Sequence, residues 1–160
     1  MKAVLRKEYG PPENLVVEEV ESQPLGKDEV RIAVRASGVN FPDTLIIQGQ
    51  YQFKPDLPFA PGAEAAGDVT EVGAGGSRFK VGDRVAWYSV CGGFADEIVA
   101  DQIQVTKIAD SMDYKTAAGM FLTYGTSYHA LVQRANIQPE ETLLVLGAAG
   151  SVSLSAVDIR

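Results

Sequence analysis

The 160-residue chain is 46% hydrophobic and 22% charged, the composition of an ordinary globular protein long enough to bury a core. Its net charge of −7 argues against nucleic acid or an anionic membrane as a partner, and no run approaches the roughly 20 apolar residues of a membrane helix. A single cysteine, Cys91, excludes an internal disulfide and a cysteine-clustered metal site. Composition therefore predicts a soluble, cytoplasmic protein that binds neither nucleic acid nor membrane.

The first two thirds of the chain have the alternating pattern of short β-strands. Residues 29–36 place four apolar side chains on one face and charged side chains on the other, which predicts a half-buried strand. Similar apolar runs occur at 15–20, 69–72, 84–88 and 98–105. Turn signals rich in glycine and proline separate these runs, at 10–12, 24–26, 73–76 and 81–83. This succession predicts a β-barrel or sandwich.

The pattern becomes helical after residue 110. Either residue of the Asp110-Ser111 pair is a candidate N-cap, with the charge of Asp113 favourable in the first turn. From 114 to 135 there is no proline, and apolar side chains recur at helical spacing. We expect Gly119 and Gly125 to divide this stretch into two helices.

A strand, a glycine turn and a helix are predicted near the end of the sequence. Thr142–Leu146 is a continuous apolar run, typical of a strand buried on both faces. Gly147–Gly150 ends it, and Val152–Ile159 has helical potential. This order opens a parallel α/β domain, where the turn brings a pyrophosphate to the amides of a helix N-terminus. Taken alone, the turn is equally consistent with a plain structural connection, because the G-x-G-x-x-G spacing is not met.

Five segments of family-like sequence follow one another in order. They are 38–43 (GVNFPD), 61–67 (PGAEAAG), 79–85 (FKVGDRV), 121–128 (FLTYGTSY) and 147–150 (GAAG). The series resembles the medium-chain dehydrogenase/reductase superfamily, specifically its zeta-crystallin-like NADPH:quinone reductases. The resemblance implies a mainly β fold with some α structure: a GroES-like barrel over residues 1–125, then a linking helix and the incomplete start of a Rossmann domain over 126–160. It also implies that NADPH and substrate meet in a cleft between the two domains.

The same resemblance implies a site without zinc. Zinc-bearing relatives have a cysteine where Asn40 stands and a histidine where Ala63 stands, and neither residue here can replace those ligands. Asp43 and Glu64 keep the flanking carboxylates, which alone do not make a catalytic zinc centre. Without a Lewis acid the substrate must accept hydride unaided. A quinone meets that demand best, and an enone or enoyl thioester is also activated, though less so.

The resemblance also supplies candidate site residues. Asn40 and Tyr51 are the catalytic candidates. The candidate NADPH contacts are Asn40, Thr126, Ala149, Gly150, Ser151 and Val152. In these roles the Asn40 amide donates near the nicotinamide, Thr126 bonds the carboxamide, and the Tyr51 phenol bonds the acceptor oxygen. Each of these three also has a structural alternative: a turn residue, a helix cap after Gly125, and a surface aromatic, respectively.

Two features depart from the family pattern. Ser151 and Ser153 stand where the turn usually continues with glycine, and the Ser153 side chain is expected to loosen the packing of helix on strand. The residue that selects between NAD and NADP would lie about 20 residues beyond the turn, outside these 160 residues. We therefore expect the isolated chain to be an inactive portion of a quinone reductase. We expect Thr142–Leu146 either to pack onto the barrel with the helix that follows it, or to pair with the same segment of another copy, which is a route to a homo-oligomer. The alternative is a non-catalytic GroES-like module that binds a partner or self-associates.

Overall fold

The computed structural model describes residues 1–75 and 78–160, which form two compact units, Met1–Gly119 and Met120–Arg160. The expected turn at 73–76 lies partly outside the described residues, at Gly76. None of the helices in the described part combines the length and the hydropathy that crossing a bilayer requires.

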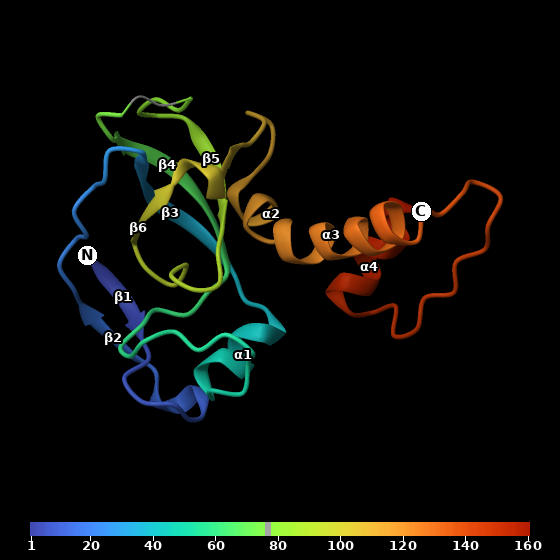
Figure 1. Ribbon diagram of the computed structural model, residues 1–160, viewed down its shortest axis with the longest axis horizontal. Helices are drawn as coiled ribbons and strands as arrows, with labels where there is room; N and C mark the ends of the chain where they lie inside the picture. Colours follow the sequence, from blue (N-terminus) through green and yellow to red (C-terminus); the bar gives the residue numbers. More distant parts are fainter. Residues whose placement is uncertain (76–77) are drawn as a thin grey trace. The chain divides into compact units, whose positions relative to one another are not determined.

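The first unit contains two antiparallel sheets (Figure 1). The larger has the strand order β6-β3-β4-β5-β7, with bounds β3 (Glu29–Gly38), β4 (Glu64–Val72), β5 (Arg84–Tyr88), β6 (Glu97–Asp101) and β7 (Val105–Lys107). The smaller sheet pairs β1 (Lys2–Leu5) with β2 (Val16–Glu19). The chain is therefore mainly β with some helix, as the sequence predicted.

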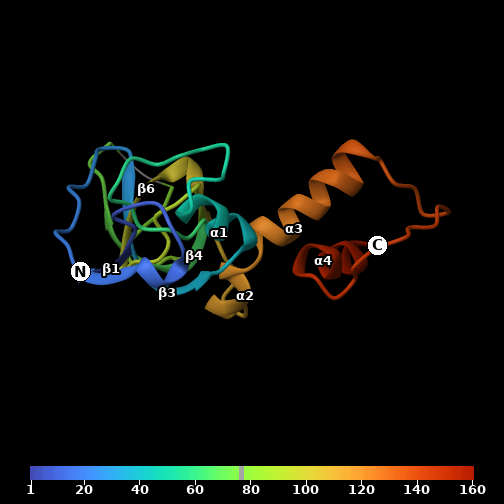
Figure 2. The ribbon, with the colours of Figure 1, turned by 90° about the horizontal axis from the view of Figure 1, so that it is seen from below.

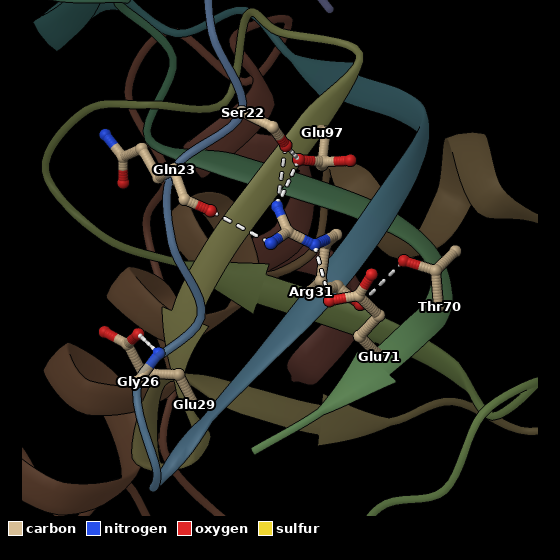
Figure 3. Close-up of polar contacts among 8 residues, drawn as sticks. All are labelled: Ser22, Gln23, Gly26, Glu29, Arg31, Thr70, Glu71 and Glu97. Carbon is tan, nitrogen blue, oxygen red and sulfur yellow. Dashed lines mark hydrogen bonds and ion pairs between the residues drawn. The ribbon is translucent and has the colours of Figure 1, made fainter.

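The alternation in residues 29–36 builds the core of this unit. Val30 and Ile32 of β3 are fully buried, together with apolar residues of the neighbouring strands. Arg31 lies between them and takes the other face of the sheet, where it donates to Glu97 of β6 at 2.5 Å and to Glu71 of β4 at 3.1 Å (Figure 3). It also donates to Ser22 Oγ and the Gln23 carbonyl oxygen. One guanidinium thus ties three strands to the segment that precedes β3.

The apolar run at 98–105 is not one strand, as its pattern suggested. Asp101 ends β6, and its carboxylate accepts the N–H of Ile103 at 2.9 Å, which starts a short 3₁₀ helix, η2 (Gln102–Gln104). The chain then re-enters the sheet as β7, at the opposite edge from β6. A local side-chain cap therefore splits the run into two strands.

Besides η2, the described part of the first unit contains three short helices: η1 (Pro12–Asn14), α1 (Phe41–Ile47) and α2 (Tyr114–Ala118). The N-cap of α2 is Asp113, whose side chain accepts the Thr116 N–H at 2.9 Å, so the predicted cap at 110–111 is wrong. The reason lies in β5. Arg84 donates to carbonyl oxygens of Ala109, Asp110 and Met112, and these bonds hold the segment in place ahead of the helix.

The second unit is helical, with α3 (Phe121–Tyr128), a π-helical turn η3 (His129–Arg134) and α4 (Ser151–Ile159). Gly119 ends α2 as expected, but Gly125 lies inside α3 and does not divide it. A glycine inside a helix costs about 1 kcal/mol relative to alanine, too little to stop a helix that tertiary contacts stabilise.

Helices α3 and α4 lie side by side in both views (Figures 1 and 2). Ser127 and Ser155 are buried where they meet, with their hydroxyl oxygens 2.8 Å apart. Ser155 also bonds the carbonyl oxygen of Thr123 at 3.0 Å, and Ser127 bonds that of Val152 at 2.7 Å. Small side chains allow this close approach, and their hydroxyls satisfy one another and the backbone.

The predicted strand at Thr142–Leu146 is not formed. The segment has no regular secondary structure, and Leu144 and Leu146 are 80% and 81% exposed. A strand exists only when neighbouring strands pair with its backbone, and none pairs with this segment among the described residues. The predicted turn and helix are present, because Gly147–Gly150 is followed at once by α4.

Candidate functional site

Asn40 stands at the junction between β3 and α1. Its backbone N–H donates to Asp43 Oδ2 at 2.7 Å, and the Asp43 N–H donates back to the Asn40 carbonyl oxygen at 3.0 Å. Pro42 follows within the first turn, where its fixed φ suits a helix start. The N-terminus of α1 is therefore closed by a short-range exchange of hydrogen bonds that fixes the Asn40 backbone.

The Asn40 side chain is held separately from its backbone. Its Nδ2 donates to Oε1 of Glu64 at 2.8 Å. Glu64 is the first residue of β4, is 0% exposed, and pairs across the sheet with Gly38 of β3. Two carboxyl groups from different elements thus fix this one half-buried asparagine.

The carboxyl group of Asp43 has a raised pKa at this junction. Asp43 is only 4% exposed, and this burial is the main reason why its pKa is raised. Backbone N–H groups of Asn40 and Gly62 lower the pKa, and the nearby charge of Glu64 raises it again. The balance favours the protonated acid relative to an aspartate in water.

Tyr51 lies beyond the other end of α1. The chain leaves the helix through Gly49, whose φ of +68° suits glycine, and reaches Tyr51 two residues later. Tyr51 is half-buried. At 1.5 Å per residue, α1 is roughly 10 Å long, so a helix separates this phenol from Asn40.

The remaining candidates belong to the second unit. Thr126 is exposed in the middle of α3, so it is not a helix cap. Ala149, Gly150, Ser151 and Val152 are all exposed at the start of α4. Asn40 and Tyr51 lie in the first unit, and a cleft that joins the two groups stays a prediction.

The turn before α4 has exposed backbone N–H groups of the kind that bind the phosphate groups of a dinucleotide. Gly147 has a φ of +66°, Gly150 is the N-cap, and the exposed N–H groups that follow carry the positive end of the helix dipole. A Cβ added at Gly150 would come no nearer than 3.5 Å to another atom, so the turn is open. Ser153, which we expected to loosen the packing, donates to the Leu146 carbonyl oxygen at 3.3 Å and braces the turn.

No three histidine, cysteine, aspartate or glutamate side chains of the described residues gather in a way that could hold a metal ion. At the two positions where zinc-bearing relatives have their ligands, Ala63 is buried and the Asn40 side chain donates a hydrogen bond to Glu64. The absence of zinc stays a prediction.

The first unit also contains a cavity of about 470 Å³, whose lining includes none of the predicted site residues. Phe59, Trp87 and Cys91 are part of its lining, whereas Asn40 and Tyr51 are not. Burial raises the pKa of the Cys91 thiol, which agrees with the interpretation of this cysteine as unreactive.

Sequence reasoning placed Asn40 and Asp43 but missed the contact between Asn40 and Glu64. One signal was present: Gly38 and Glu64 lie in two adjacent family-like segments, and a glycine two residues before a candidate site asparagine suggests a close approach. Only the pairing of β3 with β4 shows that the side chain of Glu64 is the group that approaches Gly38 and Asn40.

The chain matches known proteins along almost its whole length. Residues 26–136 match the family model of the alcohol dehydrogenase GroES-like domain. A quinone oxidoreductase-like protein 2 homolog from Nematostella vectensis is 44% identical over 99% of this chain and 43% of that protein. A solved Escherichia coli quinone oxidoreductase complexed with NADPH superposes with a TM-score of 0.90 and 32% identity, over 98% of this chain and 48% of that chain. The CurK enoyl reductase superposes with a TM-score of 0.89 and 30% identity, over 99% of this chain and 50% of that chain.

The chain belongs to the alcohol dehydrogenase GroES-like family. Within it, the chain is a member of the zeta-crystallin-like quinone oxidoreductases of the medium-chain dehydrogenase/reductase superfamily, which confirms the resemblance carried by the five ordered segments. The chain spans about half the length of these relatives or less.

Proposed function

We propose that this chain supplies the GroES-like half, and the start of the nucleotide-binding half, of a cytoplasmic, zinc-independent and NADPH-dependent quinone reductase. The observation that carries the proposal is the fixed amide of Asn40, held through its backbone by Asp43 and through its side chain by Glu64. Immobilised polar groups of this kind position a reactant with little loss of entropy at the moment of reaction.

The chemistry asks little of the protein beyond positioning. NADPH, when bound, supplies a hydride, and one proton from solvent completes the reduction of a quinone to a hydroquinone. One N–H of the Asn40 amide is used by Glu64, and the second remains to donate to a carbonyl oxygen. The half-buried phenol of Tyr51 is a second donor for the acceptor oxygen, and the exposed residues Thr126 and Ala149–Val152 would hold the cofactor.

A conjugated enone or enoyl thioester is the second candidate substrate, because the similarity to the CurK enoyl reductase favours it. Hydride transfer to such a substrate places charge on one thioester or ketone oxygen, whereas a quinone spreads it over a ring. The same amide donor would serve both. The relative rates with the two substrate classes therefore decide between them.

The test uses the polypeptide encoded by the reading frame that contains this sequence, carried through to its stop codon. We expect NADPH oxidation that depends on 1,4-benzoquinone and exceeds the rate with crotonyl thioester. Asn40→Ala should lower kcat at least tenfold, as loss of an oriented donor does, whereas Gln52→Ala, at an exposed position beside Tyr51, should not. A protein that binds no NADPH and reduces neither substrate would support a non-catalytic binding module instead. An Asn40→Ala variant with full activity would show that Asn40 takes no part in the reaction.

A further inference from the structure

The fully buried Glu64 does more than fill space beside α1. Burial of a carboxyl group is costly unless it is hydrogen-bonded, so its position must be specified by definite partners. Oε1 of Glu64 lies 2.8 Å from Nδ2 of Asn40. Capping of α1 requires only the exchange between Asn40 and Asp43, and Glu64 takes no part in that exchange.

Gly38 creates the space that lets Glu64 reach Asn40. The two residues are directly opposed in the β3–β4 ladder, where side chains of opposed residues normally meet on one face. A Cβ at Gly38 would lie 2.7 Å from Oε1 and 2.8 Å from Cγ of Glu64, and 2.5 Å from the carbonyl oxygen of Ala118. The side chain of Glu64 therefore occupies the place of the missing one and extends toward Asn40, two residues further along the chain.

The chemistry of this contact selects one orientation of the amide. An asparagine side chain has a donor end and an acceptor end of nearly the same shape, and either can face a neighbour that both donates and accepts. An ionised carboxyl group accepts only. Nδ2 of Asn40 faces Oε1 of Glu64, so the amide presents its donor end to the carboxyl group, and this choice fixes where its second N–H points.

We infer that Glu64 is a positioning residue, which fixes the Asn40 amide with its donor end inward and its second N–H available to a carbonyl oxygen of the reactants. This role rests on the proposed function, because it gives Asn40 a place in the reaction. Glu64 touches neither substrate nor cofactor in this role. It acts through Asn40 alone.

Glu64→Gln is the decisive variant, since it keeps the size of the side chain but can accept or donate. We expect kcat of the complete enzyme to fall about tenfold, the worth of one hydrogen bond of roughly 1.4 kcal/mol, with little change in KM. In an Asn40→Ala background the same substitution should have no further effect, because the two residues act as a unit. Glu19→Gln, the same change at an exposed position of β2, is the matched control.

A second measurement does not depend on activity. In the 160-residue chain, the Asn40 side-chain amide protons should give resolved NMR signals, with one proton protected from exchange and this protection lost in Glu64→Gln. If Glu64→Gln does not fold, Glu64→Asp replaces it, because it keeps an acceptor of shorter reach and should lose the same protection.

The outcomes separate the two proposals. An equal loss of kcat from Glu64→Gln with and without Asn40 would overturn the positioning role, as would unchanged exchange of the Asn40 amide. If Asn40→Ala keeps full activity while Glu64→Gln still releases the amide, the orientation is right and the catalytic assignment of Asn40 is wrong.

Discussion

The two units of this chain differ in how their apolar residues are used. In the first unit the alternating apolar side chains of β3 are buried by strands that the same unit supplies. In the second unit the most continuous apolar run, Thr142–Leu146, pairs with no strand of the described residues and leaves Leu144 and Leu146 exposed. The hydrophobic pattern of a segment thus shows which of its side chains can be buried. Whether the segment forms a strand depends on whether a neighbouring strand is present to pair with it.

The largest effect that this comparison predicts is in the core. Ile32→Ala should lower the free energy of unfolding by about 2–5 kcal/mol, because it leaves a cavity at a buried position of the core. Leu144→Ala should change it by less than about 0.5 kcal/mol, since that side chain is already in water. Urea unfolding of both variants followed by circular dichroism measures the difference. Equal losses would mean that Leu144 is buried in solution, by the rest of the chain or by a second copy.

The Arg31 cluster of Figure 3 should give the next largest effect. Arg31→Met keeps the apolar stem but removes the bonds to Glu71 and Glu97, so we expect a loss of about 1–3 kcal/mol at neutral pH. Lys7→Met breaks an exposed ion pair with Glu18 and should cost at most about 0.5 kcal/mol.

This loss should depend on pH. Burial raises the pKa of Glu97, but hydrogen bonds from Ser22 and Arg31 and the charge of Arg31 outweigh burial and lower the pKa overall. A carboxyl whose folded pKa is below its ordinary value of 4.5 stabilises the fold above that value, and this stability is lost as the pH falls through the lowered pKa. The gap between wild type and Arg31→Met should therefore close on acidification. A gap that is constant from neutral to acid pH would show that packing, rather than charge, explains it.

The second unit has its own buried contact, which tests whether that unit is folded independently of its exposed segment Thr142–Leu146. Ser155→Ala removes a hydroxyl that bonds Ser127 and the Thr123 carbonyl oxygen, and we expect it to cost about 1–2 kcal/mol. Amide hydrogen exchange of α4 should accelerate accordingly, while exchange in β3 stays unchanged. Ser153→Ala, which removes one longer bond, is the control and should have the smaller effect. Fast exchange of α4 already in the wild type would show that this contact does not hold the helix.

Local sequence signals predicted an element correctly where the residues that determine it lie close together in the sequence. The strand faces of β3 follow from a period of two, and the start of α4 follows from its glycine turn. The split of 98–105 depends on Asp101 acting as a cap, and the late start of α2 depends on Arg84, which lies about 30 residues away. Both signals exist in the sequence, but only the folded sheet shows which of many polar residues acts.

In the candidate site, too, the local contacts could be predicted from the sequence and the long-range contact could not. Family resemblance located Asn40, and the capping partner Asp43 lies three residues from it, within reach of local reasoning. The contact with Glu64 spans 24 residues and depends on register, because a shift of one residue would turn Glu64 to the other face of the sheet. Composition and spacing cannot supply that register.

The smallest expected signal is cofactor binding by the 160-residue chain itself. An exposed helix N-terminus contributes about 1–2 kcal/mol to a bound phosphate group at best. A millimolar dissociation constant requires about 4 kcal/mol, so we expect NADPH to bind more weakly than that and quinone reduction to be undetectable. Titration of NADPH followed by its fluorescence, with a benzoquinone assay alongside, measures both. Ser151→Gly, which restores the glycine usual in the family at the start of α4, should change this weak binding by less than threefold, since it adds no contact. A micromolar dissociation constant would mean that the second unit builds a complete nucleotide site from its own residues, and the contrast between a self-sufficient first unit and a dependent second unit would then fail.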